Sequence, residues 1–284
     1  MKRIYIYVIA SVILWATACS EDDSIGHVDP LEPDYVLPTG TPVDDTIANY
    51  YKRYGSYFLY KYTDLEFYYE ISYRADYSYE IADPLYVEDM LDLLKEVWMD
   101  FYPTEFHQKY MPHRIFIAGT LLDYFEDEIF TFTGTNSLYV GFCSNELENV
   151  TPEKKWECKK TLQRLLWSKW GVVINAPEEF TRISDYTTRV EDDSEQARNR
   201  GFLSGHFDDG EEYEWSSELH YYSRKEVEQK DFCSFLVHMT TRTSAELTSD
   251  LQYPLVRKKY DFLQKWFKEK YNIDLKEIGD TTYE

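Results

Sequence analysis

Cysteine is scarce in this sequence, and no long hydrophobic run follows the first fifteen residues. The chain has four cysteines among 284 residues and no C-x-x-C pair, which argues against a structural zinc site. Three of them, Cys143, Cys158 and Cys233, follow Cys19, so at most one disulfide can form among these three. Without a later apolar run of roughly 20 residues, we expect no membrane-spanning helix in the rest of the chain.

Positive charge is also in short supply. The chain has 30 Lys and Arg against 52 Asp and Glu, giving a formal net charge of −22. A surface of this sign repels nucleic acid and anionic lipid and favours solubility or cationic partners. The glycine-rich nucleotide motifs G-x-x-x-x-G-K-[ST] and G-x-G-x-x-G are missing as well. We therefore expect neither a nucleic-acid partner nor a cofactor.

The N-terminus predicts export. Lys2 and Arg3 precede a short apolar stretch (4–15), which ends in the small residues Ala-Thr-Ala before Cys19. This pattern predicts a signal peptide over residues 1–18, since the stretch is too short for a membrane-spanning helix. Small residues directly before a cysteine resemble the lipobox of bacterial lipoproteins, and this resemblance implies that Cys19 carries lipid. The alternative is a soluble secreted protein.

The residues after Cys19 suggest a surface location and a tether. Ser20-Glu21-Asp22-Asp23 resembles the surface-export signal of Bacteroidota lipoproteins, so we expect a lipid anchor in the outer membrane, facing the cell exterior. Residues 19–45 are rich in Asp, Pro, Gly and Thr and almost free of aromatics, which predicts a lipidated tether. Residues 46–284 show no internal repeat or second linker, so we expect one domain there.

The hydrophobic patterns predict an α+β fold, with strands early in the domain and helices late. Asp45 is the predicted cap of the first helix, and Thr151-Pro152-Glu153 is a typical helix start. The expected strands and helices are, in order, a helix after Asp45, Tyr-rich strands or a continuation of that helix over 57–74, a helix over 84–102, a strand over 113–119, a hairpin over 124–142, and helices over 152–171, 225–239 and 255–271.

The order of these elements and several short segments resemble the putative zinc-binding metallopeptidases of Bacteroidota. The segments are Thr161, "APEEFTRIS" (176–184), "RGFLS" (200–204), "KDFCSFLVHM" (230–239) and "VRKKYDFLQKWFKEKYNIDL" (256–275). The resemblance implies a zincin-like single domain whose central helix lies beside the helix of residues 231–239. It also implies a lipoprotein associated with a SusC/SusD-like outer-membrane importer.

The zinc motif of that family does not occur here. The family uses H-E-x-x-H, in which two histidines on one helical face bind zinc and the glutamate is the general base. Counting from Thr161 and Pro177, its positions fall on residues 164–168, with Arg164 and Ser168 in place of histidines and Leu165 in place of the base. The downstream acidic ligand falls on Ser234. No two of the six histidines are four residues apart, so another register does not supply the motif.

We therefore expect no catalytic or metal-binding residues and an accessory role, binding peptide, protein or glycan for an importer. Two alternatives are an active peptidase or other hydrolase with a rebuilt site, and a purely structural importer subunit. A rebuilt site would draw on His206, His220 or His238. Arg164 either lies on an exposed face or faces the cleft, where it needs an acidic partner or an anionic ligand such as a peptide carboxylate.

Two further segments have both a functional and an ordinary interpretation. The acidic loop with His206, Asp208, Asp209, Glu211 and Glu212 has the oxygen ligands that calcium prefers, or is a solvated loop. The Tyr-rich segment 50–62 could offer aromatic rings for sugar or peptide, or could pack in the core.

Overall fold

The computed structural model describes residues 35–189, 194–206 and 212–283. The predicted signal peptide, Cys19 and most of the predicted tether lie outside these residues, as does the greater part of the acidic loop considered for calcium. From Leu37 onward the chain forms one unit. None of the helices in the described residues combines the length and apolar character that crossing a membrane requires.

The first helix begins earlier than predicted. Helix α2 spans Pro42–Tyr54, and its N-cap is Thr41, whose hydroxyl accepts from the backbone N–H of Asp44 at 3.2 Å. Asp44 in turn accepts from the Thr41 N–H, which completes a capping box, with proline at the first helical position. The predicted cap at Asp45 is therefore wrong, and the predicted tether runs into this helix.

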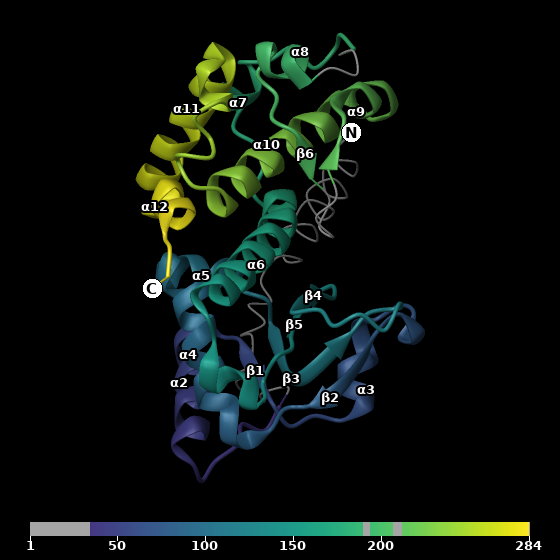
Figure 1. The fold of residues 1–284 in the computed structure, drawn as a ribbon, viewed down its shortest axis with the longest axis vertical. Helices are drawn as coiled ribbons and strands as arrows, with labels where there is room; N and C mark the ends of the chain where they lie inside the picture. Colours follow the sequence, from purple (N-terminus) through teal and green to yellow (C-terminus); the bar gives the residue numbers. More distant parts are fainter. Residues whose placement is uncertain (1–34, 190–193, 207–211, 284) are drawn as a thin grey trace, which may run out of the picture. The chain divides into compact units, whose positions relative to one another are not determined.

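A mixed sheet lies on one side of the central helix (Figure 1). Strands β1 (Tyr57–Leu59), β3 (Arg114–Leu122) and β5 (Ser137–Val140) run parallel. Strand β4 (Thr131–Thr133) returns antiparallel to β5 as the predicted hairpin and forms one edge. Strand β2 (Ser78–Ile81) pairs antiparallel with the second half of β3.

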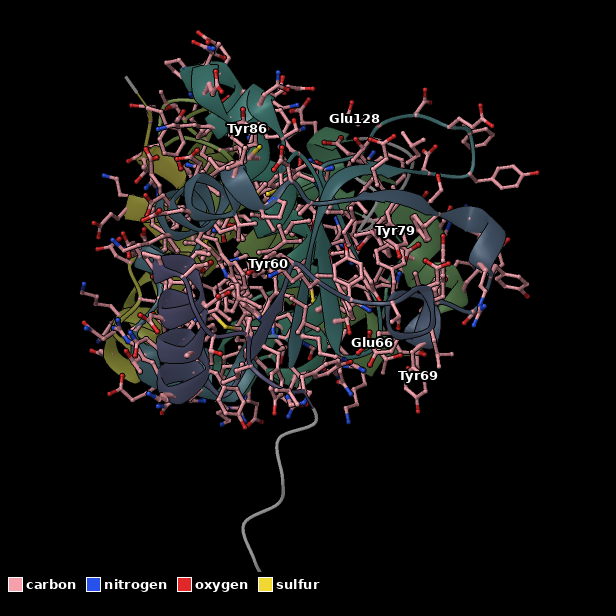
Figure 2. All side chains as sticks on the ribbon, turned by 90° about the horizontal axis from the view of Figure 1, so that it is seen from below. Tyr60, Glu66, Tyr69, Tyr79, Tyr86 and Glu128 are labelled. Carbon is pink, nitrogen blue, oxygen red and sulfur yellow. The ribbon has the colours of Figure 1, made fainter. Side chains whose placement is uncertain are left out.

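The Tyr-rich segment 57–74 is mostly not strand. Only Tyr57–Leu59 forms a strand, and Thr63 then caps helix α3 (Asp64–Phe67) through a capping box with Glu66. The alternating aromatics serve packing instead: the Phe67 ring stacks on Tyr79 of β2 at 3.9 Å between centroids. In Figure 2 the labelled Tyr60 lies among packed side chains near the middle of the view, whereas Tyr69 lies at the margin.

The remaining helices confirm the α+β class, and some of them separate the early strands. The helices predicted over 152–171, 225–239 and 255–271 are present as α6, α10 and α11, and the hydrophobic core lies between them and the sheet. In full, the α-helices described after β2 are α4 (Val87–Val97), α5 (Thr104–Tyr110), α6 (Pro152–Val173), α7 (Glu178–Thr181), α8 (Ser194–Asn199), α9 (Trp215–Tyr221), α10 (Arg224–Thr241), α11 (Pro254–Tyr271) and α12 (Leu275–Asp280). A two-stranded sheet joins β6 (Gly205–His206) to β7 (Glu212–Tyr213). Short 3-10 turns occur at Tyr68–Glu70, Arg74–Asp76, Pro84–Tyr86, Met99–Phe101, Asn145–Asn149 and Asp250–Gln252.

Helix α6 is the central element. Thr151 caps its start as predicted, accepting from the Lys154 N–H at 3.2 Å. Figure 1 shows α6 between the sheet with β4 and the helices α10 to α12. The buried Lys159 fixes its rotation, because Nζ donates to the carbonyls of Ile278 at 2.6 Å and Thr281 at 2.8 Å near the end of α12.

A buried ion pair joins α10 to α11. Lys259 Nζ lies 2.6 Å from Asp231 Oδ2, and both side chains are fully buried. Tyr186 Oη donates to the same carboxylate oxygen at 2.6 Å, and Lys259 also donates to the Gly201 carbonyl at 2.9 Å. Asp231 Oδ1 has no hydrogen-bond partner among the described residues, and burial raises the pKa of Asp231 and lowers that of Lys259, so the attraction between the two groups works against the cost of burying them.

Candidate functional site

The face of α6 that carries the predicted motif positions is partly exposed. Arg164 and Ser168 are half-buried, whereas Leu165, Leu166 and Trp167 between them are buried in the core. Residues four apart lie on one side of a helix, so the first and last motif positions share the open face. The helical geometry that a zinc site would need is therefore present, but its side chains are a guanidinium and a hydroxyl.

Helices α6 and α10 lie side by side, as the resemblance implies. A Cβ atom on Gly171 would lie 2.2 Å from the Cys233 sulfur, so the missing side chain permits the close approach. Gln229 of α10 donates to the carbonyls of Gly171 and, at 3.0 Å, Ile174, and accepts from the Ala176 N–H at 3.0 Å. Thus α10 supplies the C-terminal cap of α6, which lets that helix continue to Val173, beyond the predicted end at 171.

The two serines at predicted ligand positions are engaged in backbone hydrogen bonds. Ser168 Oγ donates to the Arg164 carbonyl one turn earlier, at 2.9 Å. Ser234 is buried on α10, and its Oγ donates to the carbonyl of Ser204 at 2.7 Å. This hydrogen bond holds the segment around Ser204 against α10.

A groove runs between the edge of the sheet and α6. Its cavity of about 520 Å³ is lined by residues 129–133, which include β4, and by Thr161, Arg164 and Leu165 of α6, and Tyr77 and Asp123 line it as well. On either side of β4, Gly141 N–H donates to the Phe130 carbonyl and Gly134 N–H donates to the Ser137 carbonyl. Positions 130, 132 and 134 therefore have their backbone groups directed toward β5. By the alternation of an antiparallel ladder, the backbone groups of Thr131 and Thr133 point away from β5.

A second cavity, of about 320 Å³, lies on the other side of Arg164. Four of its lining side chains are cationic, and Ser204, His238 and Glu212 line it as well. The cations come from three helices: Lys160 and Arg164 from α6, Arg198 from α8, and Arg242 from the end of α10. We call this space the cationic cavity.

Buried Asp250 holds two of these arginines. Its carboxylate lies 2.5 Å from Arg198 Nε and 2.9 Å from Arg242 Nη2. Arg242 Nη1 lies 3.0 Å from His238 Nδ1. A guanidinium can only donate, so Nδ1 accepts and the imidazole proton is on Nε2. Nε2 then donates to the Ser204 carbonyl at 2.9 Å, and lies 3.3 Å from Ser204 Oγ.

This tautomer decides what Ser204 and His238 can do together. A nucleophilic serine needs an imidazole nitrogen with a free lone pair to take its proton. The nitrogen nearest Ser204 Oγ already carries a proton, and the other accepts from Arg242. The pair is therefore arranged as a structural hydrogen-bond chain and not as a hydrolase dyad.

The family model described as a putative zinc-binding metallo-peptidase matches residues 41–276. The chain belongs to this family. A crystal structure of a putative zinc-binding metallo-peptidase from Bacteroides caccae has the same fold, with a TM-score of 0.54 and 13% sequence identity over 86% of this chain and 92% of that chain. At this identity the likeness shows the fold alone. No curated protein matches the chain.

The residues at the expected metal positions of this chain do not fit zinc. Arg164 stays protonated and cannot ligate a cation, and the hydroxyls of Ser168 and Ser234 are directed at carbonyls. Both nitrogens of His238 are hydrogen-bonded within the protein. His220 is exposed on α9, and the side chain of His206 lies outside the described part of the chain. Among the described residues, no group of three or more His, Cys, Asp and Glu is placed to hold a metal ion.

The structure also bears on the three later cysteines and on the Tyr-rich segment 50–62. Cys143, Cys158 and Cys233 are all free thiols, and burial raises the pKa of each to about 12, so they are poor nucleophiles. The aromatic platform over 50–62 is wrong, because Tyr54 and the residues from Tyr57 to Tyr60 are buried in the core.

The cationic cavity is the part of the site that the sequence did not reveal. The spacing of Lys160 and Arg164 places two cations on one side of the helix, and this could have been noticed. Arg198 and Arg242 are distant in sequence, and their convergence on Asp250 depends on tertiary packing, in which α8 lies against α11.

Proposed function

We propose that this member of the family is a surface lipoprotein that binds an extended polypeptide without cleaving it, as an accessory subunit of a SusC/SusD-like importer. The observation that carries the proposal is Arg164 on the open face of α6, at the border of both cavities. A permanent cation repels zinc and, in the cleft, favours an anionic or hydrogen-bonding ligand.

The groove along β4 supports a polypeptide as the ligand. An edge strand offers unpaired N–H and C=O groups, to which an extended chain can add as a further strand. The outward-facing backbone of Thr131 and Thr133 lines such a groove, and its volume of about 520 Å³ suits a short segment of chain. Of the ligand classes predicted from the sequence, peptide therefore has the strongest support.

The location and the importer partner are supported by the sequence alone. The lipobox-like residues before Cys19 and the acidic run after it favour an anchor on the outer face of the membrane. The resemblance to the Bacteroidota lipoproteins favours the importer. The lack of zinc ligands at residues 164, 168 and 234 supports an inactive site.

Peptide capture with mass spectrometry tests binding and cleavage together. The full chain is immobilised and incubated with a defined mixture of unstructured peptides, and the bound and free fractions are sequenced. We expect retained, intact peptides. In Thr133→Pro the outward N–H is removed without loss of a ladder bond, so capture should fall, whereas Thr133→Val keeps that N–H and should retain capture.

Each other outcome points to one alternative. Chelator-sensitive cleavage would indicate an active peptidase with a rebuilt site. Cleavage that a chelator does not affect would indicate another hydrolase. Neither capture nor cleavage, with the chain still present in a purified importer complex, would favour the structural subunit.

A further inference from the structure

The cationic cavity has the opposite sign to the chain that contains it. Four cationic side chains line about 320 Å³ in a chain with 22 more acidic than basic residues. Lys160 and Arg164 lie four apart on α6, a spacing at which like charges repel. An arrangement that gathers cations in this way is expected where an anion is bound.

Within the described residues, the carboxylates near the cavity leave part of the charge of Arg198 and Lys160 available. Asp250 takes the Nε of Arg198, and the two terminal nitrogens of Arg198 make no hydrogen bond with a described group. The Lys160 ammonium likewise has no hydrogen-bond acceptor among the described residues, and lies 5.7 Å from the Trp156 ring centroid. Glu212 lines the cavity, and Glu246 near Lys160 is held by the N–H and hydroxyl of Thr243 at 2.6 and 2.8 Å.

The cavity is built for a small, oriented group. Asp250 is buried and fixes Arg198 and Arg242 in place, so their fixed positions lower the entropy lost on binding. Ser204 lines the cavity, and because the His238 Nε2 proton is donated to the Ser204 carbonyl, the serine hydroxyl keeps its own proton for an acceptor in the cavity. At about 320 Å³ the space lies at the small end of ligand pockets, which run from roughly 300 to 1,000 Å³.

We propose that the cationic cavity binds the carboxylate of an acidic peptide whose backbone lies along β4. Arg164 borders both spaces, so a chain in the groove can place an Asp or Glu side chain, or its C-terminus, beside Lys160 and Arg198. Guanidinium and ammonium groups form charge-assisted hydrogen bonds with carboxylates, and the planar guanidinium can do so through two nitrogens. This inference rests on the proposed peptide binding and names the class of peptide.

Matched peptides test the inference in the full chain. The probes are labelled extended heptapeptides of Thr and Val, acetylated and amidated, that differ only by a central Glu or Gln, and a third with a free C-terminal carboxylate. Anisotropy should show about tenfold tighter binding of the carboxylate peptides than of the Gln peptide, since a charge-assisted bond contributes that order of affinity. Added NaCl should reduce this preference.

Variants that remove one charge test whether the preference for carboxylate peptides comes from the cationic cavity. Lys160→Gln should lower the affinity for the carboxylate peptides to about that for the Gln peptide, and the fold should be undisturbed because this side chain has no hydrogen-bond partner among the described residues. Arg198→Gln should do the same, with circular dichroism as a check on folding. Lys265→Gln, which removes an exposed lysine of α11, should leave the preference unchanged.

The outcomes separate this inference from the proposed function. Equal binding of the Glu and Gln peptides would overturn the carboxylate site while peptide binding stands. Binding of none of the peptides would overturn the proposed function and with it this inference. Direct binding of galacturonate or inorganic phosphate that depends on Lys160, measured by calorimetry in a chain that binds no peptide, would assign the cavity to a free anion and so also overturn the peptide inference.

Discussion

At the residue scale, His107 shows how a buried histidine in this chain is held neutral. Its side chain is 1% exposed, and Nε2 lies 2.8 Å from the Met99 carbonyl, to which it donates. Nδ1 is buried and has no hydrogen-bond partner among the described residues, so a proton there would be unsatisfied. Burial accordingly lowers the pKa of His107 to about 4.

This pKa predicts acid destabilisation. A pKa of about 4, against 6.5 in the unfolded chain, gives stability that is fully present above pH 6.5 and is lost as the pH falls toward 4. The free energy of unfolding should therefore fall by about 2 kcal/mol between pH 7 and pH 5 through this group. Urea unfolding at both pH values should show that loss in wild type and not in His107→Gln, with the exposed His220→Gln as control. Parallel pH dependence in wild type and His107→Gln would contradict the assignment.

The buried ion pair gives a second residue-scale prediction. Removing either partner of a buried pair leaves an uncompensated charge, which typically costs about 3–5 kcal/mol. Lys259→Met and Asp231→Leu should each destabilise the chain to about this extent, and the double variant should cost less than the sum of the two. Denaturant unfolding of the three variants measures the coupling, and additive effects would show that the two charges do not interact.

At the element scale, the crossing of α6 and α10 depends on Gly171. A Cβ at this position would meet the Cys233 sulfur at 2.2 Å, so the helices must separate or Cys233 must move. Gly171→Ala should lower the free energy of unfolding by about 1–3 kcal/mol, as overpacking commonly does. Cys233→Ala in the same chain should recover much of that loss. Destabilisation that Cys233→Ala does not relieve would place its cause away from this contact.

The elements also show how far the sequence could predict the structure. The cap at Thr151, the β4–β5 hairpin and the late helices were predictable, because their signals are local and lie within a few residues. The segment after Leu59 was not, because its alternating tyrosines pack around α3 and the capping box at Thr63 and Glu66 prevailed over strand propensity. The end of α6 was missed because its cap, Gln229, comes from another helix.

At the scale of the whole molecule, the account predicts a protein held on the outside of the cell. Cys19→Ala should release the chain from membranes or leave it unprocessed, because the lipidated cysteine is lost. Changing Glu21, Asp22 and Asp23 to alanine should keep the anchor but reduce antibody labelling of intact cells. If unmodified protein on intact cells is inaccessible to antibody and to added protease, the outward location is wrong.

The zinc content of the purified full chain tests the central claim most directly. Elemental analysis after dialysis against zinc-containing and then zinc-free buffer should find well under one equivalent, because Arg164, Ser168 and Ser234 offer no metal ligands in the expected register. A variant with Arg164→His, Ser168→His and Ser234→Asp should retain zinc if that register is right, and so serves as the positive control. About one equivalent of zinc retained by the unmodified chain would contradict the account.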